Sequence, residues 1–201
     1  MMATAAERHP AFTQEATRAR LGRRAWDQII SGTGAVVAIV LVALGAAAIY
    51  GGMFGRDNVR DRLEPQAIAF PPAAAMTPQE KAEIGDFAGQ SVDTGTEAEA
   101  FSRYIGLHVD EINEGKTYSQ TSAAAREEGV DPKVAAELQG KADTLFKGET
   151  LRAILLNAYG WWVVATIALY AGYGLIAAGL MLAVFAALGF RHARRAGGEA
   201  A

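Results

Sequence analysis

Two long apolar runs dominate the pattern of hydrophobic and polar residues along the chain. Residues 29–54 contain no Asp, Glu, Lys or Arg, and neither do residues 153–190. As α-helices, the two runs would be about 39 Å and about 57 Å long. The hydrocarbon core of a bilayer is only about 30 Å thick. The pattern therefore predicts two transmembrane helices, of which the second extends beyond the membrane.

The outer boundary of the second helix is predicted at Trp161 and Trp162, because indole rings favour the headgroup level of a bilayer. Asn157 and Tyr159 precede them on the more polar side. We therefore expect residues 163–188 to cross the hydrocarbon and the start of the 153–190 run to lie outside it.

Arginines beside both runs predict the topology. Eight of them lie before the first run or after the second: Arg8, Arg18, Arg20, Arg23, Arg24, Arg191, Arg194 and Arg195. Under the positive-inside rule, residues 1–28 and 191–201 are cytoplasmic tails at the plasma membrane, and residues 55–152 are extracytoplasmic. Arg56, Arg60 and Arg62 weaken this contrast. A signal peptide cleaved after residues 46–48 is the alternative for the first run, although that run continues past the site.

The region between the runs shows helix signals and no period-2 alternation of the kind that predicts strands. Prolines predict an extended linker over residues 55–76. Thr77, Pro78 and Glu80 then predict a capped helix that ends near Asp86. The fold class is therefore an all-α membrane protein, with two transmembrane helices bracketing a small extracytoplasmic helical domain.

A second capping box, Thr96 with Glu99, predicts an amphipathic helix that ends at residues 113–115. One face of it should be buried: Phe101, Tyr104, Ile105, His108, Val109 and Ile112. Further helices are predicted over residues 119–128 and from Pro132, where Val134, Ala135, Leu138, Ala142, Leu145 and Phe146 continue the helical period. Only residues 148–150 separate this last helix from the second run, so it is expected to be a bent extension of it.

Composition narrows the classes of function. The chain has 201 residues and no cysteine, which excludes a disulfide scaffold and a thiol nucleophile. Its net charge of -3 gives no general attraction to nucleic acid. Residues 55–152 carry 11 basic and 18 acidic side chains. A small acidic helical domain of this kind buries little surface of its own, so we expect it to lean on the membrane, a second copy or a protein partner.

No pattern for catalysis, a metal or a cofactor stands out, so the chain is expected not to be an enzyme. His9, His108 and His192 are far apart, and a catalytic metal needs about three protein ligands. His108 is expected mainly as a packed core residue. Tyr104, His108 and Tyr118 are the candidates for an interaction site or pocket.

Small residues four positions apart predict helix-packing seams within the apolar runs. These candidates are Gly34 with Ala38, Ala47 with Gly51, Ala168 with Gly172, and Gly174 with Ala178. The seams would join the two runs to each other or to another copy of the chain. Neither run contains an ionisable side chain of the kind that marks a proton or ion pathway.

Several short stretches also resemble a known group of proteins: residues 87–95, Tyr104-Ile105, His108, residues 115–118 and residues 145–152 ahead of an apolar run. They are similar to uncharacterised actinobacterial two-span membrane proteins that are often labelled aromatic ring-opening dioxygenase LigA. That label implies a small helical subunit that works beside an iron-bearing partner. The resemblance also implies an actinobacterial cell envelope and two spans that bracket helices.

Three functions follow from these observations, and the first is favoured. The chain is a non-catalytic accessory or scaffold protein of the plasma membrane, whose extracytoplasmic helices contact a partner or a membrane complex. The alternative is an extracytoplasmic sensor or small-ligand-binding module with a pocket at Tyr104, His108 and Tyr118. An enzyme is third, and the dioxygenase label would require bound iron.

Overall fold

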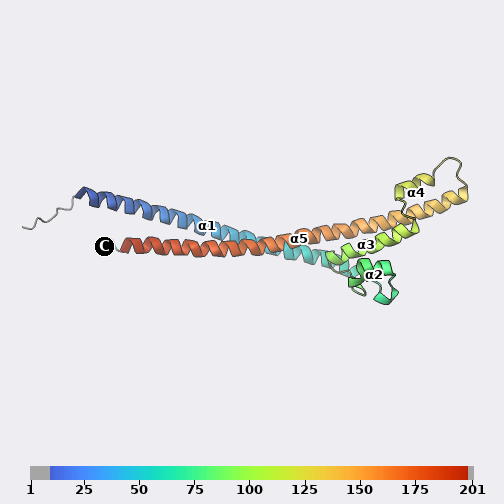
Figure 1. Ribbon diagram of the computed structural model, residues 1–201, viewed down its shortest axis with the longest axis horizontal. Coiled ribbons are helices and arrows are strands. Elements are labelled where there is room, and N and C mark those ends of the chain that lie inside the picture. The colour runs from blue at the N-terminus through green and yellow to red at the C-terminus, as the bar shows by residue number, and fades with distance from the viewer. Residues whose placement is uncertain (1–9, 199–201) are drawn as a thin grey trace, which may run out of the picture. The chain divides into compact units, whose positions relative to one another are not determined.

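The computed structural model describes the backbone of residues 10–198 and the side chains of residues 25–195 (Figure 1). Five α-helices follow one another: α1 (Pro10–Leu63), α2 (Pro78–Ile84), α3 (Gly95–Ile112), α4 (Tyr118–Ala124) and α5 (Pro132–Gly198). The described residues form no strand and only one isolated bridge, between Ala69 and Ser91. The all-helical prediction is thus confirmed. Arg8, His9, Arg18, Arg20, Arg23 and Arg24 lie outside the described side chains.

Helices α1 and α5 are both long and apolar enough to cross a membrane. Only 17% and 11% of their most apolar segments are buried inside the protein. A core helix of a soluble protein would be mostly buried. The outward side chains of both helices are therefore apolar and uncovered by the rest of the chain.

One predicted boundary within these helices was wrong, and the predicted extension of the second apolar run toward Pro132 is confirmed. The linker expected over residues 55–76 begins later, because α1 continues to Leu63 before Pro65 ends it. Within this last part of α1, Arg62 Nε donates a hydrogen bond to Asn58 Oδ1 at 2.8 Å. At the other junction, residues 148–150 do not interrupt α5, and Thr150 Oγ1 donates to the carbonyl of Phe146 inside the helix.

The chain divides into two compact units, residues 1–49 with 170–201, and residues 50–169. In the first unit, α1 and α5 run antiparallel, side by side (Figure 1). Small buried residues recur every seventh position on both helices: Ser31, Ala38 and Gly45 on α1, and Gly172, Gly179, Ala186 and Ala193 on α5. A spacing of seven keeps one stripe of each helix against its neighbour in a left-handed pair.

The backbones in this stripe approach closely. A Cβ placed on Gly45 would lie 2.8 Å from the carbonyl oxygen of Gly172, and one placed on Gly179 would lie 3.0 Å from that of Ala38. Neither glycine leaves room for a larger side chain between the helices. The seam of the first unit therefore depends on these glycines.

The four-residue spacing predicted only part of this arrangement. Three of the eight candidates, Gly34, Ala38 and Gly172, lie at the contact between the helices. Ala47, Gly174 and Ala178 in the first unit are exposed, as is Gly51 in the second, and Ala168 is half-buried. The candidates on the outward face of a helix take no part in this seam, and their packing against another copy of the chain stays a prediction.

The second unit contains α2, α3, α4 and the adjoining parts of α1 and α5, and it has a buried core. Its core takes Val59 and Leu63 from α1, and Leu155 and Trp162 from α5. The segments between these helices add the rest: Phe70, Met76, Ile84, Val92, Ala98 and Ala100. The end of α1 and the middle of α5 are thus walls of this core.

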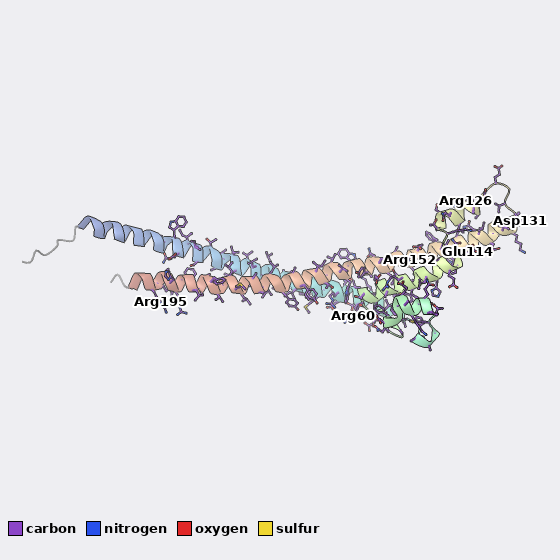
Figure 2. All side chains as sticks on the ribbon, viewed as in Figure 1. Arg60, Glu114, Arg126, Asp131, Arg152 and Arg195 are labelled. Carbon is purple, nitrogen blue, oxygen red and sulfur yellow. The ribbon has the colours of Figure 1, made fainter. Side chains whose placement is uncertain are left out.

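Helix α3 packs closely against α5 at three glycines. A Cβ on Gly95 would collide with the Cβ of Trp162, and one on Gly148 would collide with Val109 Cγ2. Between them, Gly106 faces the guanidinium of Arg152, which Figure 2 labels on α5. A larger side chain at any of these positions would push α3 away from α5.

The helix boundaries of the domain are set by side-chain caps. The Thr77–Glu80 capping box is confirmed, with Glu80 N–H donating to Thr77 Oγ1 at 3.2 Å. The second predicted box was wrong by two residues, because Thr94 caps α3 and Glu97 closes the box. Helix α4 ends at Ala124, earlier than the predicted Glu128. The stop at residues 113–115 is confirmed, with positive φ angles at Glu114 and Gly115.

Candidate functional site

Five rings form a continuous row inside the second unit. Phe87 stacks on Phe70 at a centroid distance of 5.4 Å, and Phe70 meets Phe101 edge to face at 5.2 Å. Tyr104 lies 5.3 Å from Phe101, and His108 lies 4.5 Å from Tyr104. The predicted buried face of α3 therefore brings together two of the candidate site residues, Tyr104 and His108.

His108 is not the core residue that the helical period predicted. Its side chain is 46% exposed, at the outer end of the row. Ile112, one turn further along, is also exposed. The reason is that the side of α3 that meets α5 carries Ser102, Gly106 and Val109, so the row of larger residues runs toward the domain edge.

The imidazole of His108 lies between two oxygen acceptors. Its Nδ1 lies 3.0 Å from the carbonyl oxygen of Tyr104, and its Nε2 lies 3.4 Å from Glu80 Oε1. A carbonyl and a carboxylate both accept hydrogen bonds, so each ring nitrogen of His108 has an acceptor nearby. The contact joins α2 to α3 at the surface of the domain.

Two groups in this cluster have shifted pKa values. The backbone N–H of Thr77 donates to the Glu80 carboxylate at 2.6 Å, which lowers the pKa of Glu80 from its usual value against the opposing effect of burial. The Thr77 hydroxyl and His108 act in the same direction as the N–H. Burial raises the pKa of Tyr104, and the negative charge of Glu80 adds to this. Glu80 is therefore held as a carboxylate and Tyr104 as a neutral phenol.

The third candidate, Tyr118, has a different neighbour. It lies at the start of α4, where its ring contacts Phe146 of α5 at a centroid distance of 5.8 Å. Both rings are exposed, Tyr118 by 41% and Phe146 by 59%. Tyr118 and Phe146 form what we call the outer aromatic pair, and it lies on a different part of the domain surface from the row of five rings.

The outer aromatic pair was missed because the helical period predicted Phe146 and Val134 to be buried. Along this part of α5, Ala142 and Leu145 are buried, while Ala135 and Leu138 are half-buried. Val134 and Phe146 are exposed, by 48% and 59%. Both residues lie at the border of the buried stripe. An apolar residue at such a border was the signal in the sequence that could have indicated an exposed ring.

The two tryptophans predicted at the membrane boundary differ sharply. Trp161 is 63% exposed, in keeping with a ring that faces outward. Trp162 is buried against Gly95, and the guanidinium of Arg56 lies over its ring at 4.3 Å. The prediction of an interfacial role was wrong for Trp162, because α3 covers that face of α5.

Within residues 25–195, no three side chains of His, Asp or Glu gather in a way that could hold a metal ion. Comparisons of the chain with protein-family models, with curated proteins and with solved structures found no match. The resemblance to the actinobacterial two-span proteins thus stays a prediction. The functional argument rests on the chain itself.

Proposed function

We propose that this protein is a non-catalytic accessory or scaffold protein of the plasma membrane, whose extracytoplasmic helical domain contacts a protein partner or a membrane complex. In this proposal, α1 and α5 each cross the membrane once and both termini are cytoplasmic. The apolar, largely uncovered surfaces of the two helices support the crossing. The arginines that flank the apolar segments support the orientation.

The observation that carries the proposed contact is the outer aromatic pair. Two aromatic rings exposed side by side, outside any segment that lipid would cover, are unusual on a surface that contacts only water. Aromatic side chains are enriched at protein interfaces, where they provide large rigid contact areas. Ile112 and Val134 are further exposed apolar residues of the same domain. The surface around them carries acidic side chains such as Asp143, which would form a polar rim.

The experiment compares the native complex formed by the full chain with that of two variants, after extraction from membranes in mild detergent. The wild-type chain should migrate on native gels well above the mass of one chain with its detergent. Phe146→Glu should reduce the complex at least tenfold, because it removes an exposed ring and introduces a charge into the interface. Asp143→Asn, one turn away on α5, should leave it intact. A wild-type chain that migrates as a monomer would contradict the proposal.

The orientation has a separate test, which the absence of cysteine makes simple. Single cysteines replace Ala136 and Arg194, both exposed in the structure. A maleimide that cannot cross membranes should label Ala136→Cys in intact cells, and Arg194→Cys only after the cells are opened. The reverse pattern would place the domain in the cytoplasm.

A sensor or small-ligand-binding module is the second candidate, supported by the exposed His108 next to the Glu80 carboxylate. It predicts that His108→Ala leaves the melting temperature unchanged without a ligand and abolishes a ligand-dependent increase in it. A ligand-dependent increase that persists in His108→Ala would exclude a site at this imidazole.

A further inference from the structure

A cavity of about 860 Å³ lies in the second unit between α1 and α5. Its volume is within the range of about 300–1,000 Å³ that small-molecule pockets occupy. Most of its lining is apolar, including Phe54, Val59, Leu63, Leu155, Val164 and Ala168. We call this cavity the α1–α5 groove.

The polar residues of the groove gather toward one end. They are Asn58 and Arg62 on α1 and Gln66 just beyond its end, all C-terminal to Gly51 and Phe54. The helices are antiparallel, with Gly52 against Ala165 and Leu169. Asn157, also in the lining, precedes Ala165 by eight residues, which brings it to about the level of Arg62. The groove therefore has an apolar lower part and a polar upper end.

The polar end carries one positive charge that the protein does not neutralise. Arg62 Nε donates to the amide oxygen of Asn58 at 2.8 Å. Among the described residues, no carboxylate oxygen lies within 4.0 Å of the Arg62 guanidinium. Its terminal nitrogens remain as donors for an anion, and a guanidinium matches the geometry of phosphate and carboxylate oxygens.

The apolar part continues the surface of the proposed transmembrane segments. Arg56 is the first charged residue of α1 after the apolar run, so Gly51 and Phe54 lie at hydrocarbon depth if α1 crosses the membrane. From Gly51 to Arg62 the helix rises about 17 Å. One leaflet of hydrocarbon is about 15 Å thick. The distance from Gly51 to Arg62 is thus close to the length that one acyl chain spans in a leaflet.

We propose that the α1–α5 groove binds one membrane lipid with an anionic headgroup. The headgroup lies at Arg62, where the amides of Asn58, Gln66 and Asn157 surround it. One acyl chain runs down the apolar lining toward Gly51 and Ala168, in contact with the exposed ring of Trp161. This inference uses the membrane crossing proposed above but is independent of the partner contact at the outer aromatic pair.

The test follows fluorescence of the full chain in mild detergent, with Trp26→Phe as background. Phosphatidylglycerol with brominated acyl chains is the probe, because bromine quenches a nearby indole and Trp161 lines the groove. Brominated phosphatidylglycerol should quench part of the emission in a saturable manner. Unlabelled phosphatidylglycerol should reverse this quenching, and brominated phosphatidylcholine should give only weak, non-saturating quenching.

Two pairs of variants assign the effect to the groove. Arg62→Gln should raise the lipid concentration for half-maximal quenching about tenfold, as expected for the loss of a charge-assisted hydrogen bond. Arg60→Gln removes the same charge two residues away, from a residue that lines a different cavity, and should have no effect (Figure 2). Gly51→Phe should fill the lower groove, where a new Cβ meets no atom within 4 Å, and abolish saturable quenching. Gly160→Phe, equally unobstructed and outside the groove lining, should not.

Several results would overturn the inference. Equal quenching by the two lipids would remove the role of the headgroup, and equal weakening by Arg60→Gln and Arg62→Gln would leave only general charge. Saturable quenching that survives Gly51→Phe in a chain with unchanged melting temperature would place the lipid elsewhere. Phe146→Glu should keep normal quenching, so that failure of the partner proposal and failure of the lipid proposal are distinguishable.

Discussion

A single methyl group at Gly45 should separate the two apolar helices, whereas the same change at Gly51 should not. Both glycines lie inside α1, and both substitutions to alanine would favour the helix by up to about 1 kcal/mol. At Gly51 the new Cβ meets no atom within 4 Å. At Gly45 it would lie 2.7 Å from Ile176 Cγ1 and 2.8 Å from the backbone oxygen of Gly172.

The magnitude follows from how little the neighbours of Gly45 can yield. Ordinary van der Waals contact begins near 3.4 Å, so α5 must retreat by about 0.6 Å, since the backbone of Gly172 cannot rotate away. A gap of about 0.5–1 Å forfeits a quarter to a half of each dispersion contact along the seam. Overpacking of this kind destabilises by about 1–3 kcal/mol. After subtraction of the helix preference of up to about 1 kcal/mol, Gly45→Ala should be up to about 2 kcal/mol less stable than the wild type, and Gly51→Ala equal to it or slightly more stable.

The measurement is unfolding of each purified full chain in mild detergent, with increasing denaturing detergent and circular dichroism as the signal. Gly45→Ala should unfold at a lower fraction of denaturing detergent, and Gly51→Ala should coincide with the wild type. Equal stability of the two variants would refute the seven-residue seam. Destabilisation by Gly51→Ala alone would instead favour the four-residue spacing.

Three further outcomes test the domain. Trp162→Ala should lower the free energy of unfolding of the domain by about 3–5 kcal/mol, as for other buried aromatic residues, whereas Trp161→Ala should change it by less than about 1 kcal/mol; thermal unfolding of both variants compares them. Thr94→Ala should destabilise α3 by about 1 kcal/mol through loss of its cap. Thr96→Ala changes an exposed residue inside α3 and should not destabilise it. Hydrogen exchange of the first turn of α3 compares the two variants. Because the folded pKa of Glu80 lies below the usual 4.5, its contribution to stability is present above pH 4.5 and is lost as the pH falls through the folded pKa; melting temperatures below pH 4.5 should therefore decline less in Glu80→Gln than in the wild type.

The features that the sequence could predict are those that depend on near neighbours in the chain. The box at Thr77 and Glu80 needs only a threonine, a proline and a glutamate at the right spacing, and its hydrogen bonds join residues three apart. The absence of charge from two long runs likewise predicts two long apolar helices without reference to any partner. Both predictions were confirmed because no distant residue takes part in them.

The start of α3 shows where this local reasoning ends. Thr94 and Thr96 are each followed three residues later by a glutamate, so the pattern permits either as the cap. Gly95 decides between them, because as the first residue of α3 it allows the helix to meet Trp162 of α5. That contact joins residues 67 positions apart, and the choice of cap follows from tertiary packing.

His108 is exposed and Trp162 is buried, the reverse of what the sequence predicted, and the cause is again tertiary packing. The same packing explains why the domain depends on its long helices. A hydropathy pattern describes what a side chain prefers on average, so it placed Trp162 at a membrane boundary and His108 inside the domain. Helix α5, however, meets two environments at once. Trp161 faces outward, whereas Trp162, about 100° around the helix, belongs to the buried core that also contains Val59, Leu63 and Leu155. Part of the core of the second unit is thus supplied by the helices proposed to cross the membrane, and Trp162 joins α5 to the start of α3.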